Sequence, residues 1–158
     1  MKIAFGVDPG GLELRESILA HLQEAGHEVV EVGSTDSENI VPYMIVGRNV
    51  AQKVTSGECT FGVVVCGTGV GISIAANKNK GARCAFVDNI WVAKDSRVVN
   101  DANIIALGGT TTSPRLANEY IDTFISTEWG EGLPQFRVDR IKGGAKNLAA
   151  YEDEQFGK

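Results

Sequence analysis

The chain has few of the side chains that build metal centres and cross-links. Its 158 residues include three cysteines and two histidines. The cysteines are an odd number, and no two of them are close in the sequence: they are Cys59, Cys66 and Cys84. This spacing argues against a disulfide framework and a zinc knuckle, and it predicts a reducing, cytoplasmic location. Since His21 and His27 have no other metal ligand near them in the sequence, we expect no metal site.

The sequence also lacks long apolar runs and an excess of basic residues. No stretch approaches the roughly 20 apolar residues of a membrane span. The start, MKIAFGVDPGG, has neither the length nor the small-residue cleavage site of a signal peptide. The formal net charge is −5, so binding to nucleic acid or to an anionic membrane surface is not expected.

What the chain does have is a regular alternation of apolar runs and helical patterns. Apolar runs predict strands at residues 3–7, 63–66, 82–87 and 104–107, and alternating apolar and polar residues predict one at residues 28–32. Between them, apolar residues at helical spacing predict helices over residues 14–22, 43–54, 71–77 and 89–99. This order predicts a single Rossmann-like α/β domain, doubly wound around a five-stranded parallel sheet with right-handed crossovers.

The last part of the chain has a clear start and a weak end. Ser113 followed by Pro114 is a hydroxyl cap with proline at the first helical position, which predicts a helix there. After Trp129 we expect a loop and then a helix from Phe136. We assign residues 1–142 to the α/β domain and expect residues 143–158 to form a polar C-terminal tail, either disordered or docked on a partner.

The most informative stretch is VVVCGTGVG, from Val63 to Gly71. Its branched residues favour a buried strand, and Cys66 ends that strand. Glycines follow at once, so the chain can turn sharply and let a ligand approach the backbone. The N–H groups of the next helix start favour negative charge. Since ligands bind at the carboxyl edge of open parallel sheets, we expect the functional site here.

Several interpretations of this corner remain open. The turn is not a P-loop, because the Gly-Lys-Ser/Thr ending is absent. Gly67, Gly69 and Gly71 give G-x-G-x-G, one residue short of the dinucleotide fingerprint, although Asp88 follows about 20 residues on. Cys66 is either a buried small hydrophobe or a nucleophile or general base whose thiolate is favoured by the turn amides.

Two further residues can join the same edge. Thr68 is either a turn residue or a hydroxyl that faces the pocket. Asp8 ends the first strand and therefore lies on the same edge as Cys66, as either a loop cap or a functional acid.

Four segments together resemble the ribose-5-phosphate isomerase B / galactose-6-phosphate isomerase family. They are VVVCGTGVGISIAANK, the NDAN before the fifth strand, the Gly-Gly after it, and QFRVDRI. The resemblance runs from Met1 to about Ile141. It implies a small Rossmann-like domain that forms dimers, often tetramers, with active sites between subunits. It also implies interconversion of aldose and ketose phosphates through an enediolate, with no metal or organic cofactor.

The resemblance assigns roles to individual residues. Cys66 would move a proton between C1 and C2 of the sugar, and Thr68 and Asp8 would hold or protonate its hydroxyls. The remaining residues would bind substrate: Gly67, Gly69, Val70 and Gly71 as amide donors to the enediolate oxygen, Tyr43 near the sugar, Asn100 in the neighbouring subunit's site, and Arg137 at the phosphate.

The chain departs from the family at the other half of the site. Pro9 replaces a histidine in the first loop, and Val99 replaces the histidine that opens the sugar ring. Thr110 and Leu133 stand where the family has arginines. Each lost charged contact to phosphate is worth roughly 1.5–3 kcal/mol. The enediolate half is therefore retained, and the ring-opening and phosphate-binding half is rewritten.

These observations predict an aldose–ketose isomerase for a small sugar phosphate or related sugar, and not for standard ribose 5-phosphate. A substrate that needs no ring opening fits best, such as a tetrose 4-phosphate, whose phosphate blocks the ring-closing oxygen. We expect a homodimer or homotetramer. Two alternatives remain at this stage: one subunit type of a hetero-oligomeric isomerase, and a non-catalytic sugar- or nucleotide-binding module.

Overall fold

The predicted apolar runs form one parallel sheet. The computed structural model describes residues 1–157. Its strands are β1 (Lys2–Val7), β2 (Glu28–Glu31), β3 (Phe61–Cys66), β4 (Cys84–Phe86) and β5 (Ile104–Gly108). They lie in the order β2-β1-β3-β5-β4, and every neighbouring pair is parallel. The strands β3 and β5 are buried along their whole length, as expected for strands covered on both faces.

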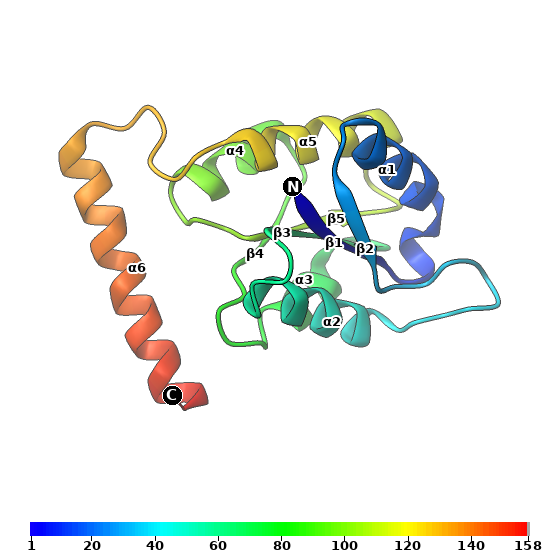
Figure 1. The fold of residues 1–158 in the computed structure, drawn as a ribbon, viewed down its shortest axis with the longest axis horizontal. Coiled ribbons are helices and arrows are strands. Elements are labelled where there is room, and N and C mark those ends of the chain that lie inside the picture. Colours follow the sequence, from blue (N-terminus) through cyan, green and yellow to red (C-terminus); the bar gives the residue numbers. More distant parts are fainter. Residues whose placement is uncertain (158) are drawn as a thin grey trace.

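Helices cover both faces of the sheet (Figure 1). A short 3₁₀ turn at Pro9–Gly11 leads into α1 (Leu12–Glu24). On one face of the sheet, α5 (Pro114–Ser126) lies between α1 and α4 (Ile90–Val98). On the other face lie α2 (Tyr43–Thr55) and α3 (Val70–Ala76). The predicted doubly wound α/β fold is confirmed.

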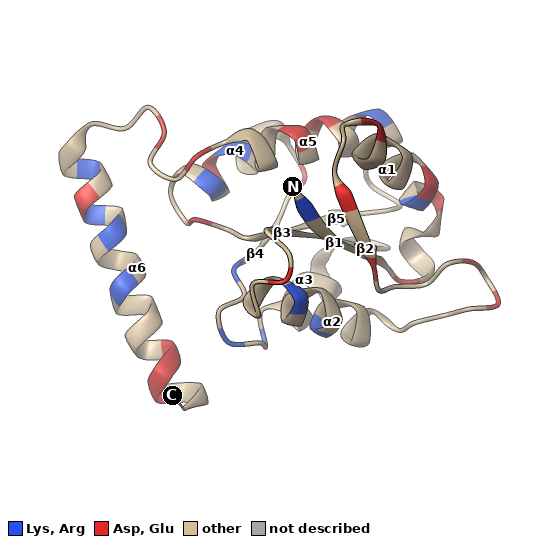
Figure 2. Ribbon diagram, in the orientation of Figure 1, with Lys and Arg blue, Asp and Glu red and all other residues tan. Residues whose placement is uncertain are grey.

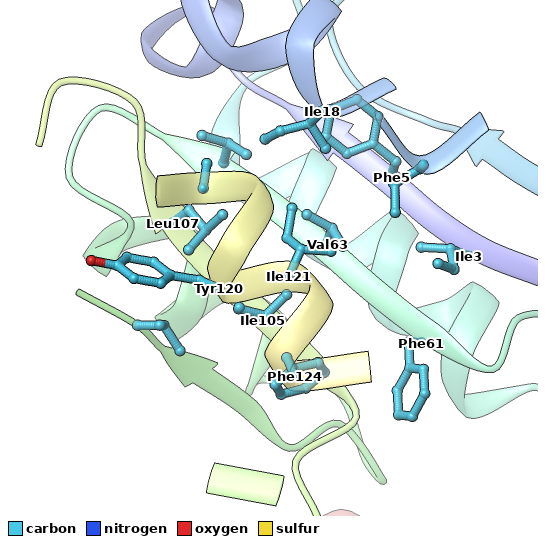
Figure 3. Packing of buried hydrophobic residues seen from close by; sticks show 14 of the residues in the cluster. Ile3, Phe5, Ile18, Phe61, Val63, Ile105, Leu107, Tyr120, Ile121 and Phe124 are labelled. Atoms are coloured by element: carbon cyan, nitrogen blue, oxygen red, sulfur yellow. The ribbon is translucent and has the colours of Figure 1, made fainter. Parts of the chain in front are cut away.

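Each layer has its own apolar core. On the α1–α5 side, Ile121 of α5 lies beside Val63 of β3 (Figure 3), and the Phe124 ring meets the Phe61 ring edge-on with 5.7 Å between their centres. On the other side, smaller residues such as Val46 and Ile72 pack against Val64. These buried layers hold the strand ends in place, so the loops at the carboxyl edge of the sheet are carried on a rigid support.

The last helix, α6 (Gln135–Phe156), lies outside the three layers (Figure 1). The predicted helix from Phe136 is present, but it does not end near residue 142: the segment expected as a weakly patterned tail continues the helix, and residue 158 lies outside the described part. None of the helix's residues is buried. Neither α6 nor any other helix of residues 1–157 is both long and apolar enough to cross a membrane.

Two features explain why the helix persists past Gly143 and Gly144. Ile141, Ala145 and Leu148 recur at helical spacing along the groove that α6 forms with the body of the protein. The far end is tethered by a Lys80–Asp153 ion pair of 2.7 Å. A weak local pattern is therefore overridden by contacts with residues distant in the sequence.

Candidate active site

Three loops converge at the carboxyl edge of the sheet, after β1, β3 and β5. The amide of Asp8 donates to the carbonyl of Val65 at 3.0 Å, and the amide of Gly109 donates to the carbonyl of Cys66 at 2.7 Å. A Cβ on Gly109 would lie 2.3 Å from the Gly10 carbonyl oxygen. The backbones of the first and third loops therefore touch directly, which only a residue without a side chain allows.

Cys66 is the last residue of β3, and its side chain faces the turn. The residue is 6% exposed, and the Gly69 amide donates a hydrogen bond to its Sγ at 3.2 Å. Gly69 has φ +79°, and a Cβ there would lie 2.9 Å from the Leu107 carbonyl carbon and the Phe86 ring. The glycine turn thus fixes the direction of the Cys66 sulphur.

Asp8 lies beside this turn and caps the 3₁₀ turn that follows it. Its Oδ1 accepts a hydrogen bond from the Gly10 amide at 2.8 Å. Burial raises the pKa of the Asp8 carboxyl, although hydrogen bonds from the amides of Gly10 and Gly11 act in the opposite direction. A carboxyl group with a raised pKa is better suited than an ordinary one to exchanging protons near neutral pH.

Three other residues of the predicted site lie on this turn or beside it. Thr68 and Val70 are exposed, and the Thr68 hydroxyl has no hydrogen-bond partner within residues 1–157. Tyr43, the first residue of α2, is 40% exposed. Its ring lies 3.4 Å from where a Cβ on Gly71 would stand. The structure therefore brings the Asp8 loop and Tyr43 to the turn of residues 66–71.

Asn100 and Arg137 do not join this group within one chain. Asn100 precedes β5, at the amino edge of the sheet, whereas Cys66 pairs with Gly108 at the end of β5. The four-residue difference between Ile104 and Gly108 alone corresponds to about 13 Å along the strand. Arg137 lies in the first turn of α6, which stands apart from the body (Figure 1).

A groove lies at the Asn100 end of the sheet, away from Cys66. A groove of about 790 Å³ separates α6 from the body. It is lined by Asn100, Val99 and Arg83 on one side and by Ile141 and Leu148 of α6 on the other. One chain therefore carries two separate surfaces that both hold residues of the predicted site.

Basic side chains are absent from the three loops around Cys66 and present on α6. The loops at residues 8–11, 66–71 and 108–113 contain no Lys, Arg or His. Basic residues gather instead on the first half of α6, while its last turns are acidic (Figure 2). Any cationic contact to a substrate bound at Cys66 must then come from outside these three loops.

Some neighbours of the site were not identified from the sequence. The Thr110 hydroxyl donates to the Gly67 carbonyl at 2.6 Å, although Thr110 stood out in the sequence only as a replaced arginine. The Phe86 ring covers Gly69. Asp101 is bound by both Arg83 and Arg97. Only the Arg97–Asp101 pair has a local i,i+4 spacing. The other pairings join residues 17 or more positions apart, so no local pattern predicts them.

Comparison with known proteins gives one consistent result. The model of the family described as Ribose/Galactose Isomerase matches residues 3–141. The chain is 34% identical over 158 residues to "4-deoxy-4-sulfo-D-erythrose isomerase" of Clostridium sp. (strain MSTE9), which covers 100% of this chain and 99% of the relative. It is 36% identical over 157 residues to "Galactose-6-phosphate isomerase subunit LacB" of Clostridium acetobutylicum, covering 99% of this chain and 88% of the relative.

A solved structure agrees in both fold and sequence. Ribose-5-phosphate isomerase B of Clostridium thermocellum superposes with a TM-score of 0.83 at 41% identity, covering 96% of this chain and 99% of that one. Family, relatives and fold coincide over nearly the whole chain, including the Cys66 turn. The chain belongs to the ribose/galactose isomerase family and is an aldose–ketose isomerase.

Proposed function

We propose that the substrate is a four-carbon aldose, or another sugar that stays acyclic, with an anionic group at its far end. The main support for the isomerase chemistry is the position of Cys66. Its Sγ faces a glycine turn and accepts a hydrogen bond from the Gly69 amide at 3.2 Å. A base beside a row of amide donors suits an enediolate, because the donors stabilise charge that appears only during the reaction.

The proposed reaction is a proton transfer between neighbouring carbons. The Cys66 thiolate takes the proton from C2 of the aldose, and the electron pair forms the C1–C2 double bond of the enediolate. Amides of Gly67 to Gly71 stabilise the oxygen that becomes negative. Asp8, with its raised pKa, and Thr68 exchange protons with the sugar oxygens. Cys66 returns its proton to C1, which gives the ketose.

The acyclic substrate is supported by Val99. By resemblance this is the position of the acid that opens the sugar ring, and valine cannot transfer a proton. A four-carbon sugar substituted at C4 has no free C4 hydroxyl, so it cannot close a five-membered ring. The name of the relative 4-deoxy-4-sulfo-D-erythrose isomerase describes such a sugar.

We further propose that two copies of the chain complete each site. The three loops around Cys66 have no basic side chain, and Asn100 and Arg137 lie too far along the fold to reach their own Cys66. In the proposed dimer, Asn100 and Arg137 of one copy reach the Cys66 turn of the other. Arg137 supplies a charge-assisted contact to the anionic end of the substrate.

Deuterium exchange tests the proposal directly. The protein is incubated in D₂O with erythrose 4-phosphate, 4-deoxy-4-sulfo-erythrose and ribose 5-phosphate, and proton NMR follows deuterium entering C1 or C2. We expect exchange with the four-carbon substrates and much less with ribose 5-phosphate. Cys66→Ala should abolish exchange, while Cys84→Ala, at a cysteine outside the turn, should not. Full activity of Cys66→Ala would refute the mechanism.

A second candidate rests on the relative named a galactose-6-phosphate isomerase subunit. In this alternative the chain is one subunit type of a hetero-oligomer, and a different chain supplies the missing histidine and arginines. The chain alone would then be inactive and would gain activity with its partner. Equal activity with and without other chains would exclude this candidate. The non-catalytic binding module is excluded by the family's activity.

A further inference from the structure

The loop between α4 and β5 contains a strained residue. Asp101 has φ +49° and is the sole non-glycine with a positive φ among residues 1–157. Aspartate tolerates the left-handed region better than most residues, but the conformation still has an energetic cost. Such strain persists when the surrounding contacts over-determine it, so the contacts of Asp101 identify what holds this loop.

Two arginines hold Asp101 from opposite sides. Arg83 donates from Nη2 to Oδ2 at 2.9 Å and from Nε to the Asp101 carbonyl at 2.7 Å. Arg97 donates from Nη1 to Oδ1 at 2.8 Å and to the Ala102 carbonyl at 2.7 Å. Each carboxylate oxygen therefore has its own guanidinium, and both backbone carbonyls after Asn100 are also bound.

Arg97 connects this arrangement to the hydrophobic core. It is 8% exposed, and its guanidinium lies 4.8 Å from the centre of the Phe61 ring and 5.7 Å from that of Phe124. Its Nε donates to the Thr127 carbonyl at 3.3 Å. A planar guanidinium can stack on rings and bind several oxygens at once, which lysine cannot do. The loop is thus anchored to the buried layer between the sheet and α5.

Asn100 directly precedes Asp101 in the chain. It is exposed, and its side-chain amide has no hydrogen-bond partner within residues 1–157. Its direction is therefore set by the backbone alone, that is, by the left-handed turn at Asp101. An ordinary exposed turn would need glycine or asparagine here and no buried cation.

We propose that the Arg83–Asp101–Arg97 clamp is a positioning device that holds the Asn100 amide in the direction required by the active site of a second copy of the chain. The inference rests on the proposed function and its two-copy site. Asp101, Arg83 and Arg97 are positioning residues in this scheme, because they act through Asn100 and do not touch substrate.

A double-mutant cycle in kcat/KM tests the clamp. Asp101→Asn keeps the size of the side chain and its tolerance of positive φ, but it removes the charge that both arginines bind. Misplacing a site residue by about 1 Å can cost up to ~100-fold, so we expect kcat/KM to fall about 10- to 100-fold in Asp101→Asn and in Asn100→Ala. In the double variant the loss should equal that of Asn100→Ala alone, because Asp101 then has nothing left to position.

The matched control is Glu119→Gln. Arg115–Glu119 is an ion pair of 3.1 Å with the same i,i+4 spacing as Arg97–Asp101, but it lies exposed on α5. The Glu119→Gln variant should therefore have the same kcat/KM as the wild type. If Asp101→Asn does not fold, Arg83→Gln replaces it in the cycle, since it removes one of the two guanidiniums.

Each outcome has a distinct meaning. If the wild type is active and Asp101→Asn lowers kcat/KM by the same factor with and without Asn100, the clamp acts elsewhere and the inference is wrong. An unchanged kcat/KM in Asp101→Asn also overturns it. In both cases the proposed function stands. A wild type inactive on the whole substrate panel would instead overturn the proposed function, and the positioning role with it.

Discussion

Two glycines with the same backbone angle allow the turn after Cys66 to be tested against an internal reference. Gly69 and Gly57 both have φ +79°. A Cβ on Gly57 would meet no atom within 4 Å, whereas a Cβ on Gly69 would lie 2.9 Å from both the Leu107 backbone and the Phe86 ring. Replacing each by alanine therefore separates the cost of the backbone conformation from the cost of crowding.

The expected free energies follow from this difference. An L-residue in the left-handed region costs about 1–2 kcal/mol, so Gly57→Ala should destabilise the protein by about that amount. Gly69→Ala should add roughly 1–3 kcal/mol for overpacking, because the Leu107 backbone cannot move aside as a flexible side chain can. The turn should also shift, which displaces the Gly69 amide from the Cys66 sulphur.

Urea unfolding followed by circular dichroism measures the free energy of unfolding of both variants at one protein concentration. Isomerase assays on the same samples measure kcat. We expect Gly69→Ala to lose more stability than Gly57→Ala and to lose at least ~10-fold in kcat, while Gly57→Ala keeps the wild-type kcat. Equal destabilisation in the two variants would show that nothing crowds residue 69, and full activity of Gly69→Ala would refute the role given to the turn.

Three further predictions concern single side chains. Because burial raises the pKa of Asp8, the stability that its protonated form contributes is present below the ordinary value of 3.8 and is lost as pH rises. The melting temperature of Asp8→Asn should therefore increase relative to that of the wild type as pH rises from about 4, and the variant should lose activity. The opposite trend in melting temperature would contradict the assignment. Thr110→Val removes the 2.6 Å hydrogen bond to the Gly67 carbonyl. Loss of a hydrogen bond worth roughly 1 kcal/mol should lower kcat/KM about 5-fold, whereas Thr110→Ser should keep the wild-type value. Equal kcat/KM in all three proteins would contradict the role given to this hydrogen bond. Phe124, fully buried against Phe61, should cost about 3–5 kcal/mol in urea unfolding when replaced by alanine, and a loss below 1 kcal/mol would contradict its place in the core.

Local sequence signals were sufficient for most of the fold. The four apolar runs became strands, since buried parallel strands are recognisable from composition, and the alternating segment at residues 28–32 became β2, a strand at the edge of the sheet. The helix start at Ser113 and Pro114 was also predicted correctly, because capping depends on neighbouring residues. The same holds for the turn after Cys66, where Gly69 takes the positive φ that glycine permits.

The resemblance to known isomerases extended the prediction to the chemistry. It added roles for Cys66 and Asp8, which their places at the ends of strands had already made candidates, and the structure places both at the carboxyl edge of the sheet. It could not show how the replaced positions are used, because Thr110 now binds the neighbouring loop and no longer carries the family's charge.

Tertiary structure decided which distant residues meet. The order β2-β1-β3-β5-β4 places the loops after β1, β3 and β5 side by side, and this order depends on how the layers pack, not on any local pattern. It also separates Asn100 from Cys66 at opposite edges of the sheet, although both flank neighbouring strands. The Asp101 clamp and the extended α6 arise in the same way, because each is stabilised by contacts between residues far apart in the chain. The sequence by itself therefore determined the elements and the glycine turn after Cys66, and the packing of those elements determined which residues surround that turn.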